Sequence, residues 1–140
     1  CRRQQLNINW KITMTTLEQV HSDSAPAAIG PYSQAIKAGP FVFLSGQIPL
    51  DPKSMEIVSD DVAAQTHQVF KNLIAVAVAA GGSLSNAAKL TIYLTDLGDF
   101  AVVNKIMAGY FSEPYPARAT IQVSALPKGS AVEIEAILAL

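Results

Sequence analysis

The stretch 116–136, PARATIQVSALPKGSAVEIEA, decides the fold of this chain. Two runs within it, residues 119–123 and 131–137, alternate apolar and polar side chains as strands do. Between them lies Leu126-Pro127-Lys128-Gly129, whose proline and glycine are typical of a turn. The pattern therefore predicts a β-hairpin, which would place the charged side chains of this stretch on two paired strands.

Three charged side chains lie in this otherwise apolar hairpin. Arg118 stands at the start of the first strand. Glu133 and Glu135 share one face of the second, because side chains two residues apart in a strand point the same way. A buried lone charge is costly, so these groups must be paired or must bind something. The residues leave two interpretations open, a structural ion pair or a site for a carboxylate ligand.

The composition limits the class of protein. The 140 residues are 50% hydrophobic and 15% charged, which suits one domain with a real core and is too short for two. No apolar run approaches the roughly 20 residues that span a bilayer, so we expect a soluble protein. Beyond residue 13 the chain has 7 basic and 11 acidic residues. Such an acidic body lacks the basic stripe that phosphates require, which argues against a nucleic-acid partner.

The thiol and imidazole content is low. Cys1 is the only cysteine, so no intrachain disulfide is possible, and we expect a reducing, cytoplasmic location. His21 and His67 lie far apart without ligand spacing, so we expect no metal and no cofactor. His67 is placed off the apolar stripe of its helix and is expected on the surface.

The first 13 residues, CRRQQLNINWKIT, are polar and basic and lack the apolar core of a secretory signal. Met14 resembles a natural start. We interpret residues 1–13 as an upstream extension, in preference to an organellar transit segment, and residues 14–140 as a single domain.

The remaining elements alternate between strands and helices. In order they are a short strand at 17–21, a hairpin of strands at 35–38 and 41–48, a helix at 62–80, a strand at 89–95 and a helix at 100–111. This order predicts an α+β fold with two helices on one face of a mixed sheet. Residues 41–44 and, apart from Glu135, residues 134–140 are apolar at successive positions. We therefore expect the other face of the sheet to pack against copies of the same chain.

The roles of three further positions, Tyr32, Gly46 and Asn104, are ambiguous from the residues alone. Tyr32 follows a loop stiffened by glycine and proline, and a core tyrosine with a bonded hydroxyl is the favoured interpretation. Gly46 interrupts a strand beside Ser45, which indicates either a bulge or a close approach of backbone or ligand, with neither favoured. Asn104 lies on the second helix, where a plain surface residue is favoured over a polar contact.

Four motifs in order resemble the RidA (YjgF) family. They are APAAIGPYSQ at 25–34, LSGQIP at 44–49, DLGDFAVVN at 96–104, and PAR at 116–118 continued by LPKG at 126–129 and VEIEA at 132–136. The resemblance implies a chorismate-mutase-like fold and a homotrimer whose sheets line a central barrel. It also implies three sites in clefts between subunits, and hydrolysis of reactive enamine or imine acids, such as 2-iminobutanoate and 2-iminopropanoate, to 2-oxo acids and ammonia.

Carried over to matching positions, the resemblance gives each site residue a role. Arg118 would bind the substrate carboxylate through its guanidinium fork, and Glu133 would position or activate the attacking water. Tyr32 would close over the substrate. Glu133 is chosen over Glu135 on the resemblance alone.

The other matched positions line or flank the same site. Ser45 and Gly46 match the pocket wall, and Asn104 lies in a family motif without so clear a role. Thr120 stands where many members carry a cysteine, so thiol chemistry is absent there while the backbone N–H can still bind a carboxylate.

The sequence is also compatible with functions other than imine hydrolysis. An iminium carbon is already electrophilic, so its hydrolysis requires orientation, a water molecule and proton handling rather than a nucleophile or metal. The same cleft would also serve a binding module that holds small carboxylates without turnover. A ribonuclease or translation inhibitor, as some family members have been described, is disfavoured by the acidic body.

Overall fold

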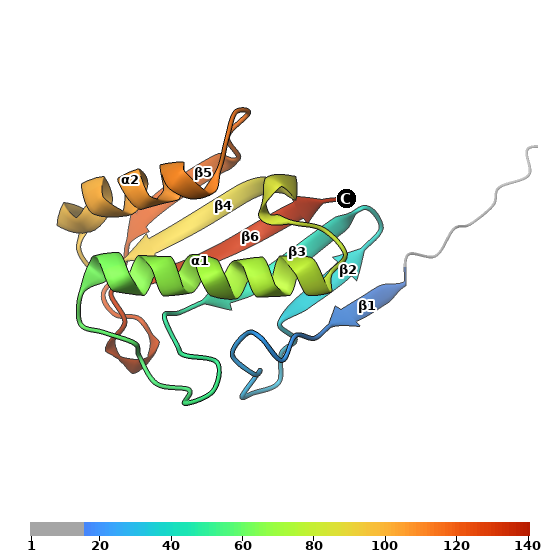
Figure 1. The fold of residues 1–140 in the computed structure, drawn as a ribbon, viewed down its shortest axis with the longest axis horizontal. Helices are drawn as coiled ribbons and strands as arrows, with labels where there is room; N and C mark the ends of the chain where they lie inside the picture. Colours follow the sequence, from blue (N-terminus) through green and yellow to red (C-terminus); the bar gives the residue numbers. More distant parts are fainter. Residues whose placement is uncertain (1–15) are drawn as a thin grey trace, which may run out of the picture.

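The structure, a computed structural model, describes residues 16–140 and shows six strands in a single mixed sheet. The order across the sheet is β1-β2-β3-β6-β4-β5. The strands are β1 (Leu17–Val20), β2 (Ala35–Ala38), β3 (Phe41–Gln47), β4 (Ala87–Leu94), β5 (Ala117–Gln122) and β6 (Val132–Ala139). Helices α1 (Val62–Ala79) and α2 (Phe100–Tyr110) lie on one side of this sheet (Figure 1). The predicted α+β class is confirmed, and the expected extension, residues 1–13, lies outside the described residues.

The predicted hairpin of β5 and β6 is wrong. Strand β6 pairs antiparallel with β3 and with β4, while β5 pairs only with β4, in parallel. Every second side chain of β6 is fully or almost fully buried, so this strand needs a neighbour on both sides, whereas β5 is largely exposed and suits an edge. The Leu126–Gly129 turn does reverse the chain, but a turn does not reveal that a third strand lies between the two it connects.

The first hairpin and the first helix are confirmed. Strands β2 and β3 pair antiparallel, with Ala38 opposite Phe41. Helix α1 begins at Asp61, whose carboxylate accepts the N–H of Ala64 at 3.0 Å. It ends before Gly81, where a φ of +89° lets the chain leave the helix, as glycine does readily.

The two helices contact each other through aromatic side chains. Phe70 of α1 stacks on Tyr110 of α2 with ring centroids 4.7 Å apart. The hydroxyl of Tyr110 also lies 2.8 Å from Nδ1 of His67, which is exposed as the sequence predicts. None of the helices among residues 16–140 is long and apolar enough to cross a membrane.

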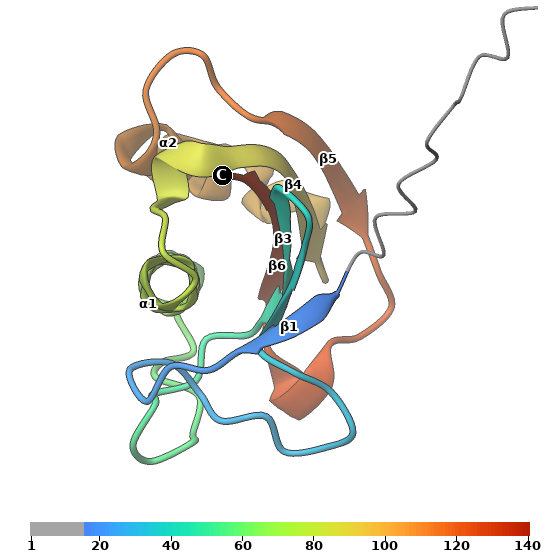
Figure 2. The ribbon, with the colours of Figure 1, turned by 90° about the vertical axis from the view of Figure 1, so that its right-hand side faces the viewer.

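The sheet is covered on one face only within the described chain. Its helix side is the core, where alternate side chains of β3, β4 and β6 are buried: Val42, Leu44, Leu90, Ile92, Ile134 and Leu138. No α-helix covers the opposite face in the described part of the chain (Figure 2). There Phe41 and Phe43 remain 45% and 46% exposed. We call this the open face of the sheet; its packing against copies of the chain stays a prediction.

Candidate functional site

A cavity of about 600 Å³ opens where the end of β3 meets the loop before β2. Four of the residues expected at the site line it, namely Tyr32, Ser45, Gly46 and Glu133. They come from three parts of the chain, the 25–34 loop, β3 and β6, which the sheet pairing brings together. The structure therefore joins these four sequence-predicted residues in one place.

Glu133 lies on the open face of β6, half-buried, directly above Gly46. A Cβ atom at Gly46 would lie 2.9 Å from Cδ of Glu133, so any larger residue there would displace this carboxyl group from its position. The pairing of β3 with β6 also shifts between Leu44 and Gln47, so Gly46 is both a bulge and a point of close approach. Burial, and then the negative charge of Glu135, raise the pKa of Glu133. A carboxyl group with a raised pKa is better matched to accept a proton near neutral pH.

Glu135 is occupied differently from its neighbour. It accepts a hydrogen bond of 2.8 Å from the hydroxyl of Tyr93, which faces Glu133 across the β4–β6 pair. This hydrogen bond is the main cause that raises the pKa of Tyr93. Glu135 is thus tied to a structural partner, and Glu133 is the carboxyl group that is better placed to handle a proton.

Tyr32 is not a core residue, so that part of the sequence interpretation is wrong. Its side chain is 49% exposed and lines the cavity, and its hydroxyl accepts only a long hydrogen bond, 3.4 Å, from the N–H of Ile29. The rigid loop predicted from its prolines does carry the ring to the cavity mouth. Ser45 secures this loop, because its hydroxyl donates to the carbonyl of Ser33 at 2.6 Å.

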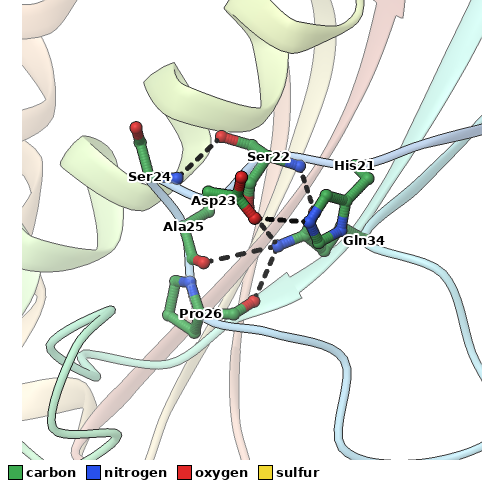
Figure 3. A network of polar contacts seen from close by, with 7 residues as sticks. All are labelled: His21, Ser22, Asp23, Ser24, Ala25, Pro26 and Gln34. Atoms are coloured by element: carbon green, nitrogen blue, oxygen red, sulfur yellow. Dashed lines mark hydrogen bonds and ion pairs between the residues drawn. The ribbon is translucent and has the colours of Figure 1, made fainter.

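Gln34 fixes the same loop from inside and was not singled out in the sequence. It is only 2% exposed. Its side-chain amide accepts the N–H of Ser22 at 2.6 Å and donates to the carbonyls of Ser22 at 3.0 Å and Pro26 at 2.8 Å (Figure 3). The network holds both ends of the segment that presents Tyr32. The signal that the sequence offered is its place as the last residue of the Pro- and Gly-containing motif APAAIGPYSQ at 25–34.

Replacing Gln34 by Ala is expected to lower the free energy of unfolding by about 1–3 kcal/mol, because buried backbone groups would lose their partners. Urea unfolding of the two proteins measures the change. Gln19→Ala, at an exposed position, is the matched control and should leave the midpoint in place. Equal midpoints for Gln34→Ala and wild type would contradict the role of the network.

Arg118 lies on the other side of the sheet from Glu133. In the β4–β5 pair Arg118 is opposite Leu90, whose side chain is buried beneath the helices, whereas Glu133 is opposite Tyr93 on the open face. Because side chains alternate along β4, Leu90 and Tyr93 point to opposite faces. A structural ion pair of Arg118 with either glutamate, one of the two interpretations that the sequence leaves open, therefore does not occur among residues 16–140.

Helix α2 holds the arginine in place. Nη1 of Arg118 donates to the side-chain oxygen of Asn104 and lies 3.6 Å from the sulfur of Met107. Its guanidinium carbon is 5.2 Å from the centroid of the Phe100 ring, within cation–π range. Asn104 is thus a polar contact, which corrects its interpretation as a plain surface residue. These groups border a second cavity of about 470 Å³, beside Tyr115.

Thr120 follows Arg118 on the same face of β5. It is opposite Ile92, another buried residue of the helix side. The Thr120 hydroxyl is buried and has no hydrogen-bond partner in the described part of the chain. An unpaired buried hydroxyl is uncommon and marks a place where a ligand or another chain can supply the missing partner.

The structure therefore divides the predicted site into two half-sites. Tyr32, Ser45, Gly46 and Glu133 form one, which we call the carboxylate half-site. Arg118, Asn104 and Thr120 form the other, the arginine half-site. The sheet itself separates them, so one chain cannot bring Arg118 against Glu133. No group of three or more His, Cys, Asp or Glu side chains in residues 16–140 is arranged to hold a metal ion.

The fold and the two half-sites define a small α+β protein whose single sheet is open on one face. The family model described as Endoribonuclease L-PSP matches residues 22–140. The chain belongs to this family, which is also named RidA. The resemblance seen in the motifs is thereby confirmed.

Individual relatives agree with this assignment. The human 2-iminobutanoate/2-iminopropanoate deaminase is 47% identical over 118 residues, 84% of this chain and 86% of the human protein. The crystal structure of RidA from an Antarctic Psychrobacter species is 52% identical, with a TM-score of 0.85 over 88% of this chain and 99% of that one. Escherichia coli TdcF, solved with bound serine, is 42% identical, with a TM-score of 0.83 over 88% and 98%.

Proposed function

We propose that this chain is an enamine/imine deaminase. It converts 2-imino acids such as 2-iminobutanoate and 2-iminopropanoate to 2-oxo acids and ammonia. The observation that carries the proposal is Glu133, a half-buried carboxyl group with a raised pKa that faces a cavity beside Tyr32. The name of the human relative, at 47% identity, supports the same reaction.

The proposed chemistry needs a water molecule and a proton acceptor. Water attacks the imine carbon, the electrons of the C=N bond move to nitrogen, and Glu133 takes a proton from the water. Glu133 then returns that proton to the nitrogen of the tetrahedral intermediate. The C–N bond breaks as Glu133 carries the hydroxyl proton to the departing nitrogen, so that the hydroxyl oxygen becomes the carbonyl oxygen of the 2-oxo acid. Ammonia leaves, and atoms and charge balance without a cofactor.

Arg118 supplies binding and orientation in this scheme. A guanidinium fork binds a carboxylate through two parallel hydrogen bonds, which fixes the imine carbon in one place. Thr120 adds its backbone N–H, and Asn104 holds the guanidinium group at the correct angle. The bound serine of TdcF is a carboxylate-bearing molecule of similar size, which supports a site for small amino or imino acids.

We further propose that two chains build each site within a homotrimer. Arg118 of one chain would meet the carboxylate half-site of the next across the subunit boundary. Two observations support this, the separation of the half-sites by the sheet and the exposed rings of Phe41 and Phe43 on the open face. Exposed apolar rings of this kind are typical of subunit interfaces. The trimer would enclose the open faces in a central barrel of the chorismate-mutase type.

Residues 14–140 form the functional domain in this proposal, and the reaction takes place in the cytoplasm. A second candidate is a binding module that holds small carboxylates without turnover, which the serine bound to TdcF also supports. The family description as an endoribonuclease keeps RNA cleavage as a third, which the excess of acidic residues disfavours.

The test couples threonine dehydratase, which releases 2-iminobutanoate, to the purified protein, with semicarbazide present to trap the imine. We expect the protein to lower the yield of semicarbazone, because hydrolysis competes with trapping. An unchanged yield together with a thermal shift in 2-oxobutanoate would identify a binding module instead. Light scattering of the same sample measures the subunit number, and a monomer would contradict the shared site.

A further inference from the structure

Two residues other than glycine adopt a left-handed backbone conformation in the described chain, and they touch each other. Met55 has a φ of 59° and Lys128 a φ of 56°. Each conformation costs roughly 1–2 kcal/mol for an L-residue with a Cβ atom. The ammonium group of Lys128 donates to the backbone carbonyl of Met55 at 2.8 Å, and both residues line the 600 Å³ cavity. Backbone strain of this kind persists only where the surrounding structure fixes it, and it is concentrated at functional sites.

The turn that carries Met55 is held by many bonds. The carboxylate of Asp51 accepts the N–H of Lys53 at 2.9 Å and of Ser54 at 3.0 Å. The N–H of Met55 donates to the carbonyl of Asp51 at 2.9 Å, and Leu50 bridges to Ile57. These contacts fix the left-handed position, which glycine would occupy without strain. The turn therefore does not explain why a methionine stands there.

The side chain of Met55 does explain it. The lining of the cavity includes the polar side chains of Glu133, Glu135 and Tyr93 and the apolar side chains of Met55, Ile29 and Leu50. For a substrate whose imine carbon lies at Glu133, these apolar residues are the part of the lining that suits an aliphatic side chain. An unbranched thioether adapts to apolar groups of different shape. The volume is also within the range of cavities that enclose molecules larger than a four-carbon acid.

We propose that Met55, fixed by its turn and by Lys128, is the specificity-determining residue of this cavity and selects 2-imino acids with longer aliphatic side chains. The inference rests on the proposed deaminase function, since it assigns to Met55 the contact with the side chain of the imino-acid substrate. Lys128 acts as a positioning residue, because it ties the Met55 turn to the turn that precedes β6.

The test compares wild type with Met55→Gly on imines that an L-amino-acid oxidase produces from leucine and from alanine. Loss of the methionine side chain should lower the ratio of kcat/KM for the leucine imine over the alanine imine by about 10- to 200-fold, the usual value of lost contacts in an apolar pocket. Met55→Leu should restore most of the ratio. Met55→Gly relieves strain, so its unfolding temperature should not fall, and a preserved fold makes the ratio interpretable.

Two further variants test whether Lys128 acts by positioning Met55. Lys128→Ala removes the hydrogen bond to the carbonyl of Met55 and should lower the ratio of kcat/KM for the two imines by a smaller factor. Lys53→Ala, an exposed side chain in the same turn, should leave it unchanged. An unaltered ratio in Met55→Gly, or an equal loss on both imines, would overturn the assignment.

Binding of the products provides a readout that does not depend on turnover. Calorimetry should show that Met55→Gly weakens the binding of 4-methyl-2-oxopentanoate more than the binding of pyruvate. If wild type hydrolyses no imine but this difference in binding is present, the deaminase proposal fails and the subsite stands. If imines are hydrolysed and neither ratio nor binding depends on residue 55, the subsite fails and the deaminase stands.

Discussion

Replacing Arg118 by Ala is expected to lower kcat/KM for 2-iminobutanoate by about 30- to 4,000-fold. Loss of one partner of a close charge pair typically costs about 2–5 kcal/mol, and the substrate carboxylate would lose its fork of two hydrogen bonds. The substrate would also lose the orientation that places its imine carbon near Glu133. The coupled semicarbazone assay measures the change.

Two controls show whether the charge or its shape matters. Arg118→Lys keeps the charge but loses the planar fork, so it should recover only part of the activity. Lys105→Ala removes an exposed cation from α2 and should retain full activity. Arg118 is exposed within its own chain, so the fold and the number of subunits of Arg118→Ala should equal those of wild type. Full activity in this variant would eliminate the arginine half-site from the reaction.

Local signals predicted the elements correctly where the physical cause is local. The stripe from Val69 to Ala77 has helical spacing, Asp61 offers a carboxylate to the first turn, and Gly81 supplies the positive φ that ends the helix. The 35–48 hairpin likewise follows from its two-residue turn at Gly39. Each of these depends on residues a few positions apart, which a sequence displays directly.

The order of the strands depends on distant residues, and there the prediction failed. The sequence shows that the chain reverses between β5 and β6, but β4 lies between them because the buried strand β6 needs a neighbour on both sides while the exposed strand β5 suits an edge. The register of both strands against β4 puts Arg118 and Glu133 on opposite faces. The motif resemblance named both residues, yet only the strand register reveals that one chain cannot bring them together.

The burial of individual side chains was equally hidden. Tyr32 follows a stiff loop, a pattern common to core and site tyrosines, and the choice depends on what Gln34 holds in place. Asn104 looks like any exposed helix residue until the guanidinium group of Arg118 is placed beside it. Favouring Glu133 over Glu135 required the position of Tyr93, which lies opposite Glu133 in the sheet but donates its hydroxyl to Glu135.

Replacing Glu133 by Gln is expected to lower kcat by about 10²- to 10⁴-fold, the usual contribution of a general acid or base. The amide keeps the shape above Gly46 but cannot take a proton from water. Glu18→Gln, which changes an exposed carboxylate on β1, is the matched control and should keep wild-type activity. Glu135→Gln should have a smaller effect, because it alters the hydrogen bond from Tyr93 and removes a charge that helps to raise the pKa of Glu133, but leaves the proton acceptor in place. If Glu135→Gln instead abolished activity and Glu133→Gln did not, the two roles would be reversed.

The raised pKa of Glu133 makes a second, linked result measurable. Its folded pKa lies above the ordinary value of 4.5, because burial and the charge of Glu135 disfavour ionisation. The folded protein therefore binds this proton more tightly than the unfolded chain does. The resulting stability is fully present below pH 4.5 and is lost as the pH rises through the raised value.

In the wild type, activity should appear over that same pH interval, since only the ionised carboxylate accepts a proton. Glu133→Gln should lose this acid limb of the pH–rate profile while its stability at neutral pH stays equal to or above that of wild type. An acid limb that persists unchanged in the variant would assign the proton transfer to another group.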